Sequence, residues 1–212
     1  MSVRVKICGL GTVASLDAAL AGGADYVGLV FFPPSPRHVT PARAQALAAH
    51  ARGHAKIVTL LVDASDAEIA AAVAAAEPDL LQLHGAEPPA RVAEVRRRWG
   101  LPVIKAIPVA SRADVAGARG FAGVADLVLF DARAPVDSSR PGGNGEPFDW
   151  QALAGVAPAP FVLSGGLTPD NVAAAIRITG ATMVDVSSGV ERRPGEKDCA
   201  LIGQFIRAAK GV

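Results

Sequence analysis

One of the two cysteines in this chain stands where it could move a proton. Cys8 ends a strand-like run, "VRVKIC", directly before a glycine. Because alternate side chains of a strand share a face, Arg4, Lys6 and Cys8 point to the same side. A nearby cation and a strand-end position both favour a reactive thiolate. The alternatives are structural: Cys8 as a small buried residue, and Lys6 and Arg4 as interior cations that pair with a carboxylate such as Asp185.

Polar residues also end three later strand-like runs. The same alternation gives Gln82 and His84 a common face, places Asp131 at the end of its run, and gives Asp185 and Ser187 a common face. In a parallel barrel these ends meet on one rim, where acid–base chemistry is assembled. Structural explanations remain open, namely a loop cap for Asp131 and a satisfied strand-end side chain for His84.

Two consecutive strand-like runs are followed by loops suited to an anion. In "FVLSGGLTPDNV" a strand leads through two glycines to a helix, and in "VDVSSGVE" a strand leads to two serines and a glycine. Barrels often bind phosphate after their last two strands, through backbone N–H groups that need no full positive charge. The candidate phosphate-binding residues are Gly165, Gly166, Ser187, Ser188 and Gly189.

Eight apolar runs of strand length alternate with helix-like segments. They cover residues 3–8, 26–31, 56–62, 80–84, 103–109, 127–131, 161–165 and 183–188. Runs rich in Leu and β-branched residues are typical of parallel strands covered on their outer faces. This order predicts a single-domain (β/α)8 barrel over residues 1–212 with short loops. A doubly wound open sheet is the alternative, but "CGLGTVAS" lacks the spacing of the dinucleotide-binding fingerprint.

Helix-start signals lie between these runs. Serine or threonine caps followed by proline or an acidic residue predict helix starts at Thr40–Pro41, at Ser65 with Glu68, and at Thr168–Pro169. A short helix is expected around "DWQALAG" (149–155), and the last helix is expected over "EKDCALIGQFIRAAK" (196–210). The glycine-rich stretch 138–147 could serve either as a lid or as a plain surface linker.

The composition argues against large charged or apolar partners. Lys and Arg number 21 against 20 for Asp and Glu, so no strong field is available to hold nucleic acid or an anionic membrane. No Cys or His spacing suggests a metal site, and no disulfide framework is possible. No signal-like or bilayer-length apolar segment stands out, so we expect a cytoplasmic protein that acts on a small molecule.

The chain resembles the phosphoribosylanthranilate isomerases of tryptophan biosynthesis. The matching motifs occur in the family's order over essentially the whole chain. They are "KICGL" (6–10), "FFPPSPRHV" (31–39), "LLQLHG" (80–85), "LFDA" (129–132), "FDW" (148–150), "SGGLTPDNV" (164–172), "VDVSSGVE" (184–191) and "PGEKD" (194–198).

The resemblance implies a specific chemistry. This family is a (β/α)8 barrel that converts N-(5-phosphoribosyl)anthranilate to 1-(2-carboxyphenylamino)-1-deoxyribulose 5-phosphate by an Amadori rearrangement, without metal or cofactor. Its general base falls on Cys8 and its general acid on Asp131, while Arg37 would contact the anthranilate carboxylate. Lys6, His84 and Asp185 would support substrate binding. For this chemistry Cys8 must lose its proton, and we expect Lys6 to lower the thiol pKa.

The resemblance leaves some alternatives and departures. Gly11 and Asn144 stand where the family usually has a polar residue and a threonine. Ribulose-phosphate 3-epimerase would need metal-ligating histidines, and indoleglycerol-phosphate synthase would need an N-terminal extension and a lysine–glutamate set. A non-catalytic sugar-phosphate sensor would retain only the phosphate loops. We expect a phosphorylated aminosugar substrate, a monomer or homodimer, and no nucleic acid or membrane partner.

Overall fold

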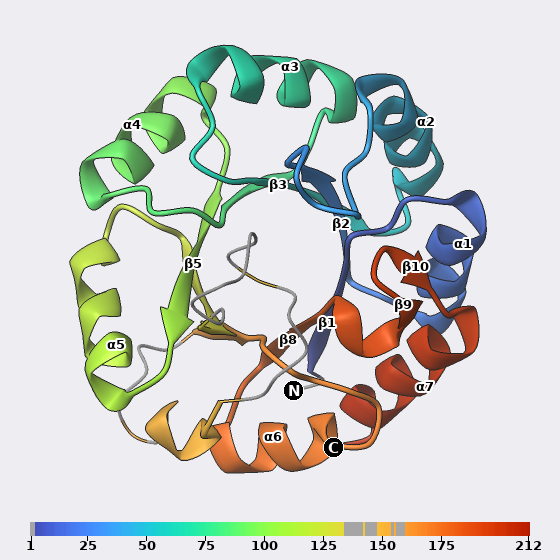
Figure 1. Cartoon of the computed structure of the whole chain (residues 1–212), viewed down its shortest axis with the longest axis vertical. Coiled ribbons are helices and arrows are strands. Elements are labelled where there is room, and N and C mark those ends of the chain that lie inside the picture. The colour runs from blue at the N-terminus through green and yellow to red at the C-terminus, as the bar shows by residue number, and fades with distance from the viewer. Residues whose placement is uncertain (1–2, 134–141, 143–147, 154, 156–159) are drawn as a thin grey trace.

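Eight parallel strands close into a barrel in the computed structural model, which describes residues 3–133, 142, 148–153, 155 and 160–212 (Figure 1). Each strand pairs with its neighbour in chain order, and the first pairs with the last. The strands are β1 (Arg4–Cys8), β2 (Tyr26–Phe31), β3 (Lys56–Leu61), β4 (Leu80–Leu83), β5 (Val103–Val109), β6 (Leu127–Ala132), β7 (Phe161–Leu163) and β8 (Met183–Val186). The (β/α)8 barrel is confirmed, and the open doubly wound sheet is wrong.

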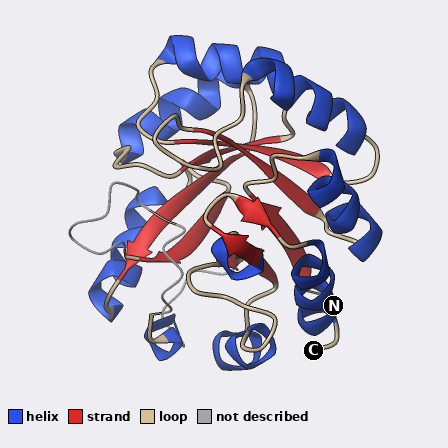
Figure 2. Cartoon of the chain, turned by 45° about the vertical axis from the view of Figure 1, so that its right-hand side comes forward, coloured by secondary structure: helices blue, strands red, loops and turns tan. Residues whose placement is uncertain are grey.

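Helices surround the barrel in both views (Figures 1 and 2). They are α1 (Val13–Gly22), α2 (Pro41–Ala51), α3 (Asp66–Ala76), α4 (Pro89–Trp99), α5 (Arg112–Gly117), α6 (Val172–Thr179) and α7 (Cys199–Lys210). Short 3-10 turns occur at η1 (Ala118–Phe121), η2 (Trp150–Leu153) and η3 (Ser188–Val190), and a small antiparallel pair is formed by β9 (Glu191–Arg193) and β10 (Glu196–Lys197). In the described ranges no helix combines the length and apolarity needed to cross a bilayer.

Two helix starts follow the sequence signals. The Thr40 side chain caps α2 with Pro41 in its first turn, and Ser65 and Glu68 form a reciprocal capping box at α3. The stretch 138–147, which could be a lid or a surface linker, and the substitution at Asn144 within it lie outside the described residues, apart from Gly142.

Two other helix starts were predicted wrongly. Helix α6 begins at Val172 rather than at Thr168, because the Asn171 side chain accepts from the Thr168 N–H and donates to Gly166 O, which closes a turn first. Helix α7 begins at Cys199 rather than at residue 196, because Asp198 caps it and the two preceding residues belong to β10.

The barrel has an apolar core on both sides of its wall. Seven buried apolar residues form one cluster in the barrel interior: Val58, Leu80, Ile104, Ala106, Leu129, Val162 and Met183. A larger cluster packs the outer strand faces against the helices and includes Val5, Ile7 and Phe205. Because side chains alternate along β1, Lys6 and Cys8 are left to the interior, as the sequence predicted.

The outer core should carry much of the stability. Phe205 of α7 is fully buried, so we expect Phe205→Ala to lower the free energy of unfolding by about 3–5 kcal/mol. Urea denaturation would measure this loss. Ile178→Ala on the exposed side of α6 is the control and should change stability by less than about 0.5 kcal/mol. Equal effects at the two positions would contradict the assignment of this core.

Candidate active site

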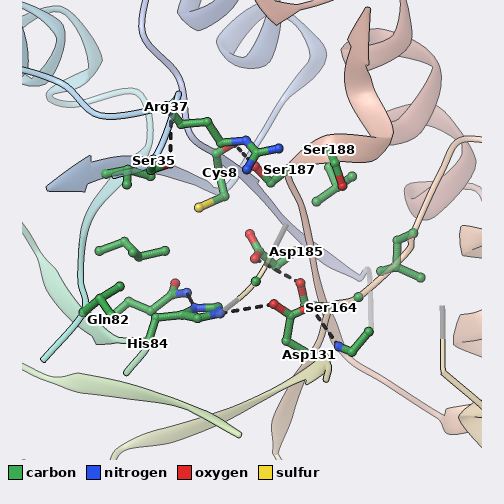
Figure 3. Close-up of a pocket in the computed structure, with 18 of the residues that line it drawn as sticks. Cys8, Ser35, Arg37, Gln82, His84, Asp131, Ser164, Asp185, Ser187 and Ser188 are labelled. Atoms are coloured by element: carbon green, nitrogen blue, oxygen red, sulfur yellow. Dashed lines mark hydrogen bonds and ion pairs between the residues drawn. The ribbon is translucent and has the colours of Figure 1, made fainter. Parts of the chain in front are cut away.

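Polar ends of the barrel strands meet in one cavity. The empty space of the cavity and its open mouth together is about 810 Å³. Cys8, His84, Asp131 and Asp185 all line it. Figure 3 shows the Cys8 sulfur turned into the cavity, with His84 and Asp131 on the opposite wall and Asp185 between them. The structure therefore brings together the strand-end residues that the sequence singled out.

A buried ion pair lies below this cavity. Lys6 and Asp185 are register partners of β1 and β8, and Lys6 Nζ lies 2.9 Å from Asp185 Oδ1. Ser164 Oγ donates to the other carboxylate oxygen of Asp185 at 3.3 Å. Burial opposes the charge on Lys6, but Asp185 and the neighbouring Cys8 outweigh it and raise the Lys6 pKa. The pairing of Lys6 with Asp185 is thus confirmed, while Arg4 instead donates to the Tyr26 hydroxyl.

Cys8 is closely packed and buried from solvent. Its register partner on β2 is Gly28, where an added Cβ would lie 3.0 Å from the Cys8 sulfur and 3.2 Å from Lys6 Nζ. Burial is the largest influence and raises the pKa of the Cys8 thiol; Lys6 and Lys197 lower it and Asp185 raises it, for a net rise. Lys6 thus lowers the thiol pKa as expected, but desolvation outweighs this cation, so the net pKa is raised.

Asp131 is held by two donors. Its Oδ1 accepts from the Ala132 backbone N–H at 2.9 Å, and its Oδ2 lies 3.1 Å from His84 Nε2. On the far side of the imidazole, Gln82 Nε2 lies 2.9 Å from His84 Nδ1. Gly142 passes so close that an added Cβ would stand 2.5 Å from both Asp131 Oδ2 and His84 Nε2. This carboxyl is therefore positioned by its own strand β6, by His84 directly after β4, and by the close approach of Gly142.

Arg37 belongs to a charged network that the sequence did not predict. Its Nε and Nη2 donate to the two carboxylate oxygens of Glu191 at 2.7 and 2.8 Å. Lys197 Nζ also donates to Glu191, and it reaches Ser187 O at 2.8 Å. Ser187 in turn donates from Oγ to Cys8 O. Arg37 lines the cavity, so the network links a candidate binding residue to the candidate base.

Burial and charge act on the network in opposite directions. Burial would raise the pKa of Glu191, but the Arg37 and Lys197 contacts lower it overall. For Lys197, burial is the largest influence and lowers the pKa despite the nearby carboxylate. Glu191 and Lys197 lie within the quoted motifs "VDVSSGVE" and "PGEKD", which is the signal that could have found them.

The two glycine-containing loops come together above β7 and β8. Gly165, Gly166, Ser187 and Ser188 line the cavity. Gly165 and Gly166 have φ of 82° and 65°, and within the described part of the chain their N–H groups donate to no protein acceptor. Gly189 does not line the cavity; a Cβ there would stand 1.8 Å from Leu167 O, so this glycine allows the two loops to pack together. Lys6 likewise lies beneath the cavity wall rather than on it.

A second cavity adjoins the first. It shares His84 and Asp131 and is otherwise bounded partly by the ion pair of Lys105 with Glu87, whose atoms lie 2.7 Å apart. Among the described residues, no group of three Cys, His, Asp or Glu side chains has a geometry that could hold a metal ion.

Comparisons with known proteins point to one family. The sequence model of the family described as "N-(5'phosphoribosyl)anthranilate (PRA) isomerase" matches residues 5–208. An N-(5'-phosphoribosyl)anthranilate isomerase of Nitrobacter hamburgensis is 58% identical over 213 aligned residues, covering 100% of this chain and 95% of the relative.

Solved structures agree. A phosphoribosyl anthranilate isomerase in complex with reduced 1-(o-carboxyphenylamino)-1-deoxyribulose 5-phosphate is 33% identical, with a TM-score of 0.82 over 99% of this chain and 100% of the other. Monomers of the dimeric isomerase from Thermotoga maritima give a TM-score of 0.84 at 33% identity, over 99% and 100% of the two chains.

The burial of Cys8 predicts an unusually weak acid. We expect its thiolate to form with a midpoint above the ordinary value of about 8.5, because desolvation outweighs Lys6. Titration of the thiolate ultraviolet absorbance in a Cys199→Ser background would measure it, since Cys199 is the other, exposed thiol. A midpoint below the ordinary value would contradict this prediction.

Proposed function

The chain belongs to the N-(5'-phosphoribosyl)anthranilate isomerase family, enzymes of tryptophan biosynthesis, and on that premise we propose an Amadori mechanism. In it, N-(5-phosphoribosyl)anthranilate becomes 1-(2-carboxyphenylamino)-1-deoxyribulose 5-phosphate, with Cys8 as general base and Asp131 as general acid. The observation that carries the proposal is that these two groups face one cavity from opposite walls (Figure 3).

The reaction needs one proton delivered and one removed. Asp131 gives its proton to the furanose ring oxygen as the bond from that oxygen to C1′ breaks, and the anilinic nitrogen forms an iminium with C1′. Cys8 then takes the proton from C2′, and the electron pair moves toward the iminium nitrogen to give an enolamine. Tautomerisation of the enolamine yields the ketone. The iminium serves as the electron sink, which is the part a cofactor supplies in related chemistry.

The buried thiol suits the role of a base. A raised pKa leaves little thiolate near neutral pH, but each thiolate formed is a stronger base than one of low pKa. Lys6 and Lys197 provide fixed positive charge for the thiolate once it forms. Lys6 therefore acts through Cys8 and Asp185 rather than by touching the substrate.

Binding groups surround this pair of catalytic residues. We assign the phosphate to the loops of Gly165 and Gly166 and of Ser187 and Ser188, where backbone N–H groups can hold an anion without a strong net charge. Arg37 is assigned to the anthranilate carboxylate. Asp185 and His84 line the same cavity and complete the proposed substrate site.

Several wider properties belong to the same proposal. The isomerase would work without a cofactor as a single domain spanning residues 1–212, in the cytoplasm, as a monomer or homodimer. Its partner would be the phosphorylated aminosugar alone, with no nucleic acid or membrane.

Removal of either catalytic group should reduce turnover. We expect Cys8→Ala and Asp131→Asn each to lower kcat by about 10²–10⁴-fold with KM largely kept, because each removes one proton-transfer group. Loss of phosphoribosylanthranilate fluorescence would follow the reaction. Cys199→Ala and Asp17→Asn change the same residue types at exposed positions and should leave activity unchanged. Full activity in either site variant would remove that residue from the mechanism.

Arg37 should act mainly in binding. Its planar guanidinium is held at the cavity by two hydrogen bonds to Glu191, and an ammonium can reproduce neither that fork nor the resulting orientation toward a substrate carboxylate. We expect Arg37→Lys to raise KM by at least about 10-fold with a smaller effect on kcat, given about 1.5–3 kcal/mol for hydrogen bonds to charged groups. Arg43→Lys, an exposed change of the same kind, is the control. An unchanged KM would contradict the assignment.

A further inference from the structure

Three polar side chains form a line that ends at the proposed acid. Gln82 is fully buried on β4, and its Nε2 lies 2.9 Å from His84 Nδ1. His84 Nε2 lies 3.1 Å from Asp131 Oδ2. Figure 3 shows the three in sequence along one wall of the cavity. The mechanism described above uses only the last of them.

The chemistry of the amide determines how the imidazole is protonated. An amide nitrogen can donate hydrogen bonds but cannot accept them, so His84 Nδ1 must be the acceptor and carries no proton. The imidazole proton then sits on Nε2 and is donated to Asp131 Oδ2. A second proton on His84 would point Nδ1–H at the amide N–H of Gln82, where it would meet a donor.

This arrangement supports the carboxylate that forms when the proposed acid has acted. When Asp131 gives its proton to the ring oxygen, the electron pair stays on the carboxylate. The carboxylate is then stabilised by the two N–H donors already in place, His84 Nε2–H and the Ala132 backbone N–H.

With the Gln82 amide in this orientation, its carbonyl oxygen has no hydrogen-bond partner among the described residues. This oxygen, Gln82 Oε1, is buried. Such orphaned acceptors are rare, and each calls for an explanation. The opposite orientation would bring Oε1 to His84 Nδ1 and would require a proton there. The two orientations therefore predict different protonation of the same nitrogen.

Asp131 is the one charged side chain among the described residues that forms a hydrogen bond with the His84 imidazole. In the described part of the chain, the ring nitrogens of His84 form hydrogen bonds with Gln82 and Asp131 alone. The other charged side chains that line the cavities on either side of it are Arg37, Asp63, Arg133, Asp185 and the ion pair of Lys105 with Glu87. The Cys8 thiol faces it from the opposite wall.

We propose that Gln82 is a positioning residue that holds His84 in the Nε2–H form, so that His84 donates a hydrogen bond to the Asp131 carboxylate that remains once the proton has been delivered. The inference rests on the proposed role of Asp131 as general acid. It assigns His84 a role as hydrogen-bond donor to the acid, in place of a proton carrier.

Nitrogen NMR of the ligand-free protein tests the tautomer directly. We expect His84 Nδ1 to give the signal of an unprotonated nitrogen and Nε2 that of a protonated one. The other three histidines are His38, His50 and His54, so a His84→Gln variant assigns the signals. A proton on Nδ1 in the wild-type protein would overturn the proposal.

Two variants of Gln82 connect the tautomer to catalysis. Gln82→Glu supplies an acceptor, so Nδ1 should become protonated and kcat should fall by at least about 10-fold with KM largely kept; a wrong histidine tautomer can cost up to about 10⁴-fold. Gln82→Met removes the donor at similar size and should give mixed tautomers with a smaller loss. Gln45→Glu, on the exposed face of α2, is the charge control and should change neither readout.

The outcomes separate this inference from the proposed function. A fall in kcat without a change at His84 Nδ1 would indicate a merely structural role and overturn the inference, as would unchanged kcat in Gln82→Glu. If the wild-type protein does not consume phosphoribosylanthranilate, the proposed function fails, and that failure is seen in the activity assay alone. The nitrogen spectrum needs no substrate and still decides the tautomer.

Discussion

A fully buried ammonium group constrains the centre of this barrel. Lys6 has no exposed surface, and a buried charge is tolerated only when it is paired and hydrogen-bonded. Asp185 meets that requirement from the neighbouring strand because β1 and β8 pair with these two residues opposite each other. A slip of one residue in either strand would turn one of the two side chains toward the helices. The strand pairing that closes the barrel therefore also places the two residues that form the floor of the candidate site.

The strand pattern made most of this predictable. Short apolar runs gave the eight strands, and their alternation placed Lys6, Cys8 and Asp131 correctly because those positions depend only on local geometry. The starts of α6 and α7 were missed because side-chain contacts of Asn171 and Asp198 override the preceding proline and acidic signals. The Arg37–Glu191 contact spans 154 residues and depends on the path of a loop, which no local pattern specifies.

Desolvation explains why the pKa of Cys8 is raised although a cation lies beside the thiol. The cation beside Cys8 suggested a low thiol pKa, yet the same packing that brings Lys6 close also removes water from the sulfur. The loss of water outweighs the attraction of Lys6 and Lys197 for the thiolate, so burial determines the direction of the pKa shift. The same competition lowers the pKa of Lys197, where an adjacent carboxylate does not offset the loss of water.

The two proposed proton-transfer groups are supported in different ways, and the difference fits their tasks. Cys8 must become an anion, and its neighbours Lys6 and Lys197 are cations whose charge attracts that anion at any orientation. Asp131 must alternate between neutral and charged forms, and its neighbours are N–H donors, which stabilise the carboxylate without a full charge that would hold it permanently ionised. Lys6, His84 and Ala132 sit on or directly after barrel strands, whereas Lys197 comes from the separate β9–β10 pair. The proposed phosphate and carboxylate contacts come from loops, where a binding group can adjust to the substrate without moving the acid or the base.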